Sequence, residues 1–369
     1  MDQKLTVVLL LYDRAPFTFR WMSYANTVKF PFHIIIADGS KGDVAEKGLV
    51  DKSKYPNISY EYVRYPYDKD VPTFYKKMYE AVSLVKTKYV IIADNDDIYF
   101  KDALIKAVEF LEKNDDYVAA RGEIYDFQIN KTDDSNQKEH THGKMTGYRR
   151  IFTSPSNEAP TALERVRIFS EFSDSLWQDV RRAEKVKECF KILVESDVTD
   201  MDLIENMSNY LMVTCGKVYR GTGLYMLHQT HEDGLAQSMT KMDVFDWIMK
   251  PKWPEEISKT FNLIAKKISA IDKISTEYAN NRIMQYYICY MIGKGMIKNR
   301  LERKIKINKS SKIAYLSHIF SKENKIRILI KKLYLKFANI REERKSNRDI
   351  ESSPYYKDLM IVKNFLLNK

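Results

Sequence analysis

Three apolar runs, each followed at once by an aspartate, constrain the fold of this chain more than any other feature. Residues 5–12, 32–37 and 89–93 are almost wholly apolar, and Asp13, Asp38 and Asp94 come next. Such runs predict strands that are buried on both faces, as in parallel sheets. Because the carboxyl ends of parallel strands open onto the ligand crevice, we expect these aspartates to gather at one edge of a sheet.

Helical patterns separate the runs. Apolar residues recur at helical spacing over 73–85 and 102–111, and shorter strands are expected over 59–64 and 117–121. Alternating strands and helices predict a doubly wound α/β layer structure, and 369 residues suffice for a full core. Further on, we expect helix over 161–194, strand and loop over 212–237, and almost only helices beyond 254.

The positive charge is confined to a C-terminal segment. The chain carries +11, and residues 298–349 alone hold 17 Lys and Arg against 5 Asp and Glu. Within this segment, 325–341 forms a basic helix with one apolar stripe, which predicts either contact with an anionic membrane surface or packing on the body of the protein. The body is nearly neutral, so a nucleic-acid partner is not expected.

Two further features bear on location. No apolar run approaches the roughly 20 residues that cross a bilayer, and no secretory leader is recognisable. The three cysteines have no metal or redox spacing, which favours a reducing, cytoplasmic compartment.

The stretch Asp94-Asn-Asp96-Asp97 places three carboxylates within four residues. Carboxylates this close repel one another, so a hard cation such as Mg²⁺ or Mn²⁺, held by one or two of them and by substrate phosphates, would explain the cluster. The alternative is a turn in which Asp97 or Asp102 caps the next helix.

The order of these elements resembles the nucleotide-sugar half of GT-A fold glycosyltransferases, and more narrowly the family 2 type. The resemblance rests on Tyr12-Asp13-Arg14, Ala37-Asp38-Gly39-Ser40 and the D-x-D-D after the next strand, over about residues 4–125. It implies a GT-A-like domain over 1–250, with a nucleotide-binding half (1–125) and an acceptor half (126–250). A basic, mainly helical region (251–369) follows.

The resemblance also implies a reaction and its partners. The expected donor is a nucleoside diphosphate sugar, with a UDP-sugar as first choice, and the expected cofactor is Mn²⁺ or Mg²⁺. The acceptor is a hydroxyl of a glycan or lipid-linked glycan, as in cell-surface polysaccharide synthesis, with inversion at the sugar. Such an enzyme would be cytoplasmic, with peripheral contact at the inner face of the cell membrane.

Donor-site residues carry over where they match the family pattern. Asp38 would hydrogen-bond the base, while Tyr12 and Asp13, the latter at a position where the family usually has asparagine, would line the base and ribose. Asp94 would face the ribose or a metal-bound water, and Asp96 would bind the metal. Lys76 is a candidate nucleotide contact, with a solvent-exposed charge as the alternative.

Acceptor-site residues are expected further along the chain. Asp202 and Glu205 precede a helix-like stretch at 206–213 and are candidate catalytic bases, although acidic residues in a first helical turn are also ordinary dipole partners. His228 follows a glycine-containing loop region and is a candidate metal ligand, against a packed or exposed side chain.

Two other classes of protein remain open at this point. Nucleotidyltransferases also place aspartates and Mg²⁺ at strand ends, but the turn after the first strand here, Asp13-Arg-Ala-Pro-Phe17, lacks their phosphate-binding glycine. A nucleic-acid-binding protein would use the basic segment, which has few aromatics and no recognisable binding motif.

Overall fold

The computed structural model describes residues 4–130, 141–151, 153–231, 247–293, 340, 341 and 343–367. The named strands are β1 (Leu5–Leu11), β2 (His33–Asp38), β3 (Tyr60–Arg64), β4 (Tyr89–Asp94), β5 (Ile98–Tyr99), β6 (Tyr117–Asn130), β7 (Lys144–Arg150), β8 (Val180–Arg182) and β9 (Lys217–Gln229). The named α-helices are α1 (Ala15–Thr27), α2 (Val44–Leu49), α3 (Val71–Ser83), α4 (Lys101–Lys113), α5 (Ala162–Phe172), α6 (Ala183–Glu195), α7 (Met201–Thr214), α10 (Trp253–Asp272), α11 (Thr276–Gly293) and α14 (Tyr356–Leu367).

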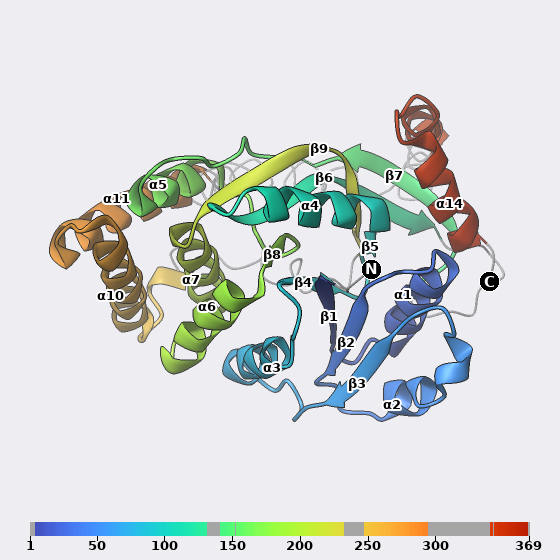
Figure 1. The fold of residues 1–369 in the computed structure, drawn as a ribbon, viewed down its shortest axis with the longest axis horizontal. Coiled ribbons are helices and arrows are strands. Elements are labelled where there is room, and N and C mark those ends of the chain that lie inside the picture. The colour runs from blue at the N-terminus through green and yellow to red at the C-terminus, as the bar shows by residue number, and fades with distance from the viewer. Residues whose placement is uncertain are drawn as a thin grey trace, which may run out of the picture.

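The strands form one mixed sheet in the order β3-β2-β1-β4-β8-β6-β9-β5, and β7 pairs with β6 (Figure 1). β3, β2, β1 and β4 are mutually parallel, whereas β8 is antiparallel to both of its neighbours. The carboxyl ends of β1, β2 and β4 therefore lie along one edge, as the three aspartate-terminated runs predict.

Both faces of the parallel strands are buried, which explains why these strands read as continuous apolar runs. Val8, Ile35 and Ile92 belong to a core formed with α3, α5, α6, α7, α10 and α11. Their neighbours Leu9 and Ile36 belong to the core under α1, α2 and α4. Successive side chains of a strand point to opposite faces, so each layer of helices covers one alternate set. The predicted α/β fold of the GT-A type, with a helical C-terminal region, is confirmed.

The structure differs from the expected elements at three places. β6 runs on to Asn130, and residues 131–140 lie outside the described part of the chain. The helix expected over 161–194 is instead α5, a loop, β8 and α6. The helix expected from 206 begins at Met201, and the region expected as strand and loop from 212 starts with the end of this helix.

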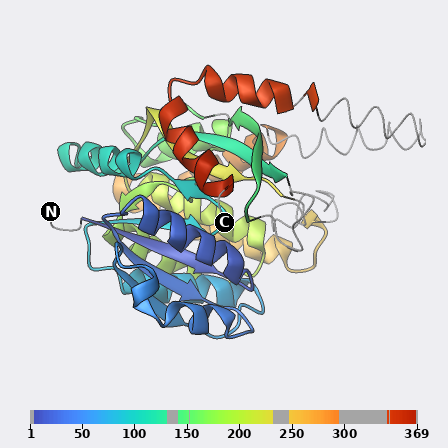
Figure 2. The same ribbon diagram turned by 90° about the vertical axis from the view of Figure 1, so that its right-hand side faces the viewer.

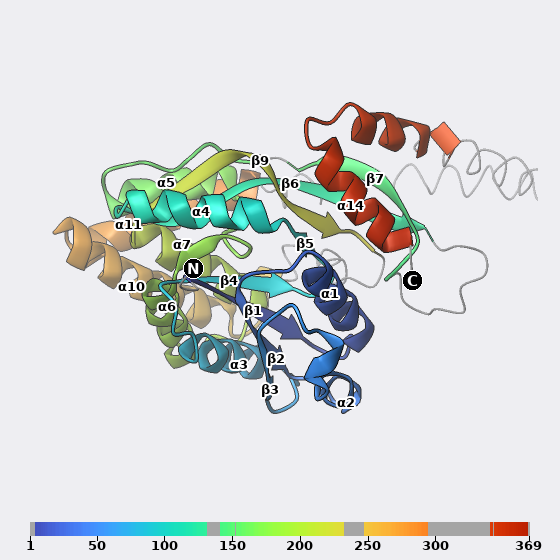
Figure 3. The ribbon, with the colours of Figure 1, turned by 45° about the vertical axis from the view of Figure 1, so that its right-hand side comes forward.

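The last helix packs on the N-terminal half of the chain. α14 lies against β7 and close to α1 (Figures 2 and 3), and the Gly143 N–H donates to the Leu366 carbonyl at 2.9 Å. Tyr24 of α1 meets the edge of Phe365, with ring centroids 5.5 Å apart. Of the expected membrane-binding segment 325–341, only Ile340 and Arg341 are described, so that prediction falls outside the structure.

Candidate active site

The turns after β1 and β2 are joined by hydrogen bonds. Asp13 has a positive φ of 50°, a conformation that Asp and Asn adopt more readily than most residues. Its backbone N–H donates to Ser40 Oγ at 2.8 Å, and its Oδ1 accepts from the Lys41 N–H at 2.7 Å. The same preference explains how Asp13 can stand where family 2 usually has asparagine.

Asp38 holds the second turn together. Its carboxylate is fully buried and accepts from the Ser40 N–H at 2.8 Å, the Tyr62 hydroxyl at 2.5 Å and Arg64 Nη1 at 2.9 Å. The expected hydrogen bond between Asp38 and the base of a donor nucleotide stays a prediction, and a base could reach this fully buried carboxylate only if neighbouring groups moved.

A wall of aromatic and acidic side chains stands beside these turns, and Tyr12 is the member of it that the sequence predicts. Tyr12 and Tyr67 stack with ring centroids 5.7 Å apart, and their hydroxyls are 3.0 Å apart. Next to them, buried Asp68 pairs with buried Lys77, and the second carboxylate oxygen, Asp68 Oδ1, has no hydrogen-bond partner among the residues that the structure describes. The only hint in the sequence is that a polar, tyrosine-rich turn follows the third strand.

Gly39 is required by this packing. A Cβ at Gly39 would collide with the Asp68 carboxylate, which Lys77 holds in place. We expect Gly39→Ala to destabilise the protein by about 1–3 kcal/mol and to weaken nucleotide binding. Gly42→Ala is the matched control, because a Cβ there meets nothing within 4 Å. Equal melting temperatures of the two variants would contradict this account of Gly39.

Hydrogen bonds with α1 and β9 hold the acidic stretch after β4 in place. Asn95 Nδ2 donates to Thr18 Oγ1 at 3.0 Å, and buried Arg20 donates to the Asp96 carbonyl at 2.6 Å. Asp97 Oδ1 accepts from the Gln229 N–H at 3.2 Å, whereas its buried Oδ2 has no partner. Asn95, Arg20 and Asp97 thus fix the turn that carries Asp94 and Asp96.

The three carboxylates differ in how their charge is compensated. Burial tends to raise the pKa of Asp96, but His231 and Arg14 hold that pKa at about 2. Burial and the nearby Asp96 raise the pKa of Asp94 to about 6. Burial also raises the pKa of Asp97. Negative charge is therefore only partly balanced at this edge of the sheet, where a cation would be stabilising.

Asp94 and Asp96 fit the requirements of Mg²⁺ or Mn²⁺. Such ions are commonly held by one or two carboxylates, with substrate phosphates and water completing the coordination. In the part of the chain that the structure describes, no group of three or more His, Cys, Asp and Glu side chains is placed to hold a metal. The fit therefore rests on two carboxylates and on ligands from the substrate.

The two histidines near the end of β9 have different partners. His231 Nε2 lies 3.0 Å from Asp96 Oδ2 and 2.5 Å from Arg14 Nη2. His228 Nδ1 lies 3.0 Å from Asp126 Oδ1. Burial lowers the pKa of His228, but Asp97 and Asp126 outweigh it and raise the pKa to about 9. His231 contacts Asp96, whereas the predicted His228 contacts Asp126, so the geometry favours His231 over His228 as a metal ligand.

The candidate bases lie at the start of α7. Asp200 is the N-cap: its Oδ1 accepts from the Leu203 N–H at 3.2 Å, and its Oδ2 accepts from Trp247 and Lys250. Burial and Asp200 raise the pKa of Asp202. Glu205 is exposed. Burial raises the pKa of Tyr75, and the negative charge of Glu205 adds to that rise.

Trp177 connects this region to Asp94. Its indole packs on Phe74 and Tyr75, and its Nε1 lies 3.4 Å from Asp94 Oδ1. Asp94 therefore adjoins the aromatic group of Phe74, Tyr75 and Trp177.

Lys76 and Lys77 have opposite surroundings. Lys76 is exposed on α3 and lies 3.9 Å from Glu80, as expected of a solvent-facing charge. Lys77, its neighbour in sequence, is the buried partner of Asp68. The predicted contact of Lys76 with the nucleotide is thus not supported by its position, while Lys77 stabilises the wall of the site.

Comparison with known proteins finds one family that matches part of the chain. Residues 27–172, from the end of α1 through α5, match the family described as Glycosyl transferase family 2. This match includes Asp38, Asp94 and Asp96 but not the turn at Asp13. No curated protein sequence matches the chain significantly.

Solved structures of TarS from S. aureus are similar at a low level. One TarS structure has 13% identity and a TM-score of 0.45, covering 78% of this chain but only 44% of that one. TarS 1-349 in complex with UDP-GlcNAc has 15% identity and a TM-score of 0.46, covering 78% and 73% of the two chains. Both scores are below 0.5, so the assignment rests on the family match. The predicted resemblance is confirmed over residues 27–172, which match the glycosyltransferases of family 2.

Proposed function

We propose that this enzyme transfers a sugar from a nucleoside diphosphate sugar to a hydroxyl acceptor, with inversion and with Mn²⁺ or Mg²⁺ bound by Asp94 and Asp96. The observation that carries the proposal is the set of incompletely compensated carboxylates at the carboxyl end of β4, beside the joined turns at Asp13 and Ser40. A diphosphate with its cation complements both the charge and the position of this cluster.

The donor would lie along the edge of the sheet. The stacked Tyr12 and Tyr67 offer a platform for a base. Arg14 places a fixed positive charge next to Asp96, which suits phosphate oxygens. The bound cation would act as a Lewis acid on the leaving diphosphate.

The acceptor would approach from the side of α7. The hydroxyl oxygen of the acceptor bonds to the anomeric carbon while a carboxylate removes the proton of that hydroxyl. The bond from the anomeric carbon to the diphosphate breaks at the same time. Glu205, an exposed carboxylate near the start of α7, is our first candidate for this base, and Asp202 is the second.

Isosteric substitutions separate the two candidates. We expect Glu205→Gln to lower kcat by about 10²–10⁴-fold with little change in donor binding, because only proton removal is lost. Asp202→Asn is the matched control and should lower kcat much less. The reverse order of effects in a steady-state transfer assay would assign the base to Asp202.

The donor is identified by thermal-shift measurements with UDP-, GDP-, CMP- and dTDP-sugars, each with and without Mn²⁺. Binding at 100 times Kd stabilises a protein by about 2.7 kcal/mol, which is readily detected. We expect one nucleotide, a UDP-sugar first, to raise Tm only when Mn²⁺ is present. No shift with any of them would overturn the donor proposal.

The proposal also covers the acceptor and the cellular location of the enzyme. We infer a glycan or lipid-linked acceptor in cell-surface polysaccharide synthesis, and a cytoplasmic enzyme that touches the inner face of the membrane through 325–341. None of the helices among the described residues has the length and apolar character that a membrane span requires.

Flotation with anionic liposomes tests the membrane contact. Each basic residue near such a surface contributes about 1 kcal/mol, so replacing Lys325, Lys331, Lys332 and Lys336 by Gln should release the protein. Equal flotation of the variant and the unaltered chain would exclude this segment as the membrane contact.

A further inference from the structure

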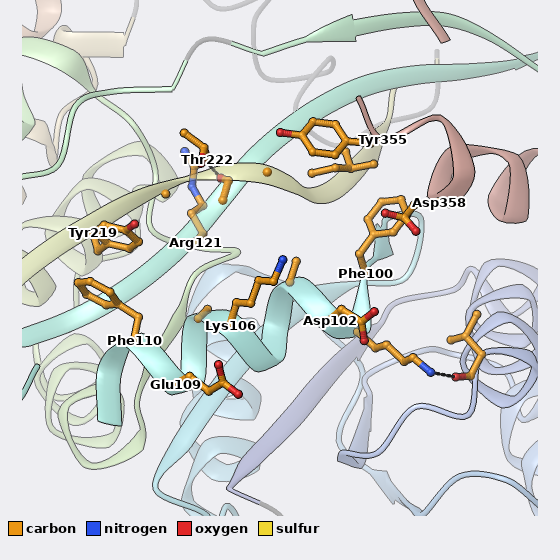
Figure 4. A pocket seen from close by; sticks show the side chains of 18 of the residues that line it. Phe100, Asp102, Lys106, Glu109, Phe110, Arg121, Tyr219, Thr222, Tyr355 and Asp358 are labelled. Carbon is orange, nitrogen blue, oxygen red and sulfur yellow. Dashed lines mark hydrogen bonds between the residues drawn. The ribbon is translucent and has the colours of Figure 1, made fainter. Parts of the chain in front are cut away.

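A cavity of about 740 Å³ lies outside the candidate active site, between α4 and the paired strands β6 and β9 (Figure 4). Its volume is within the roughly 300–1,000 Å³ of small-molecule sites. The last residues of α1 line it, whereas Arg14, just before α1, contacts Asp96. A 13-residue helix is about 20 Å long, so the cavity and the acidic cluster lie at opposite ends of α1.

The strands form an irregular wall of this cavity. Arg121 pairs with Arg220 and Glu123 with Leu224, so Gly122 of β6 faces three residues of β9, Gly221 to Gly223. This bulge takes the peptide groups of 221–223 out of the regular pairing. Gly223 has a φ of +106°, and a Cβ there would meet nothing within 4 Å. β-Bulges are frequent next to binding sites, where they expose backbone groups that would otherwise be paired.

Aromatic rings from three segments line the cavity. Phe110 of α4 and Tyr219 of β9 stack with centroids 3.7 Å apart and an interplanar angle of 12°. Figure 4 shows Phe100 and Tyr355 further along the same cavity. Rings of this kind offer flat apolar surface, and tyrosine adds a hydroxyl at its edge.

The charged side chains of the lining are five cations and three carboxylates. Six of them, Lys29, Lys106, Lys113, Asp102, Glu109 and Asp358, make no hydrogen bond or ion pair with any residue that the structure describes. The other two cations are engaged: Lys101 donates to the Val28 carbonyl, and Arg121 pairs with Asp174. Three ammonium groups and three carboxylates of the lining are therefore unpaired within the part of the chain that the structure describes.

This combination suits one class of ligand. Carboxylates only accept hydrogen bonds and ammonium groups only donate them, so a ligand rich in hydroxyls, which do both, can satisfy all six. Carboxylates without a cationic partner would repel a phosphate group. Covering unpaired charges with a lipid tail would remove them from water at a large cost in free energy. The C–H faces of a sugar ring can pack on the aromatic rings.

We propose that this cavity binds a neutral oligosaccharide segment of the glycan on which the enzyme acts. This inference rests on the proposed function, because the segment is taken to belong to the acceptor or product. A second contact away from the reacting end raises the effective concentration of the chain at the active site.

Calorimetric titration of the full chain with chitohexaose, maltohexaose and cellohexaose tests the proposal. We expect at least one of them to bind, and Lys106→Ala/Glu109→Ala to weaken that binding roughly tenfold, or about 1.4 kcal/mol, through the loss of two hydrogen bonds. Lys191→Ala/Glu195→Ala, which removes an exposed ion pair on α6, is the matched control and should bind the hexasaccharide as tightly as the unaltered protein does.

The outcomes separate this site from the active site. Asp96→Ala should leave hexasaccharide binding unchanged, and Lys106→Ala/Glu109→Ala should leave Mn²⁺-dependent stabilisation by the donor unchanged. Failure of all three hexasaccharides to bind, or equal binding by the cavity variant, would overturn the oligosaccharide site while the donor proposal stands. Loss of hexasaccharide binding in Asp96→Ala would show that the sugar occupies the active site instead.

Discussion

Asp96→Ala is expected to abolish sugar transfer, lowering kcat by about 10³-fold or more, because it removes a carboxylate that would hold the cation at the developing charge of the leaving diphosphate. Donor binding should persist weakly and lose its dependence on Mn²⁺. Thermal-shift and transfer assays with and without Mn²⁺ measure both effects.

Two controls accompany this variant. Asp96→Asn retains the shape of the side chain and should be nearly as inactive, which excludes a packing effect. Asp115→Ala removes an exposed carboxylate whose side chain is 90% accessible and should leave activity unchanged. An Asp96→Ala protein that kept its Mn²⁺-dependent stabilisation would show that the metal ligands are misassigned.

Lys77→Met is expected to be the most destabilising single change in the donor site. It leaves the buried Asp68 carboxylate without its partner, at a cost of about 3–5 kcal/mol, which corresponds to a fall in Tm of roughly 5–15 °C. Lys76→Met, at the next position, removes only an exposed ion pair and should cost less than about 0.5 kcal/mol.

The pH dependence of Lys77→Met checks the cause. Burial already raises the pKa of Asp68, and Lys77 opposes that rise, so the variant should have a higher pKa still. A carboxyl group whose pKa is raised by folding destabilises the protein at high pH and less so once pH falls below that pKa. The Tm deficit should therefore shrink between pH 7 and pH 5, and Lys77→Met/Asp68→Asn should recover most of it. A deficit that does not change with pH would point to lost packing instead.

The strands of the donor half were predictable because a strand that is buried on both faces consists of a continuous run of apolar residues. The break between α5 and β8 could not be predicted, because the apolar residues of α5 and of α6 both recur at helical spacing. The break depends on Ser173, which ends α5 with a positive φ of 55°, and on Trp177, which leaves the helical path to contact Asp94.

The candidate site was predictable only where neighbouring residues carry its chemistry. Asp94, Asp96 and Asp97 are a visible cluster, but the contact of Asp96 with His231 joins residues 135 positions apart. Nothing local distinguishes His231 from His228; their roles depend on where β9 ends and on which carboxylate each imidazole meets. Asp68 and Lys77 were missed for a similar reason, since a buried ion pair and two exposed charges look alike in a sequence.

The packing of α14 has a consequence for any attempt to shorten the enzyme. Leu359, Val362 and Leu366 share a core with Phe127, Met145 and Tyr24, so removing the final helix would bare apolar surface on the helix that follows Arg14. Loss of activity after C-terminal truncation would then report damage to the donor site as readily as loss of a membrane anchor. The region beyond residue 251 is for this reason better probed by substitution than by deletion.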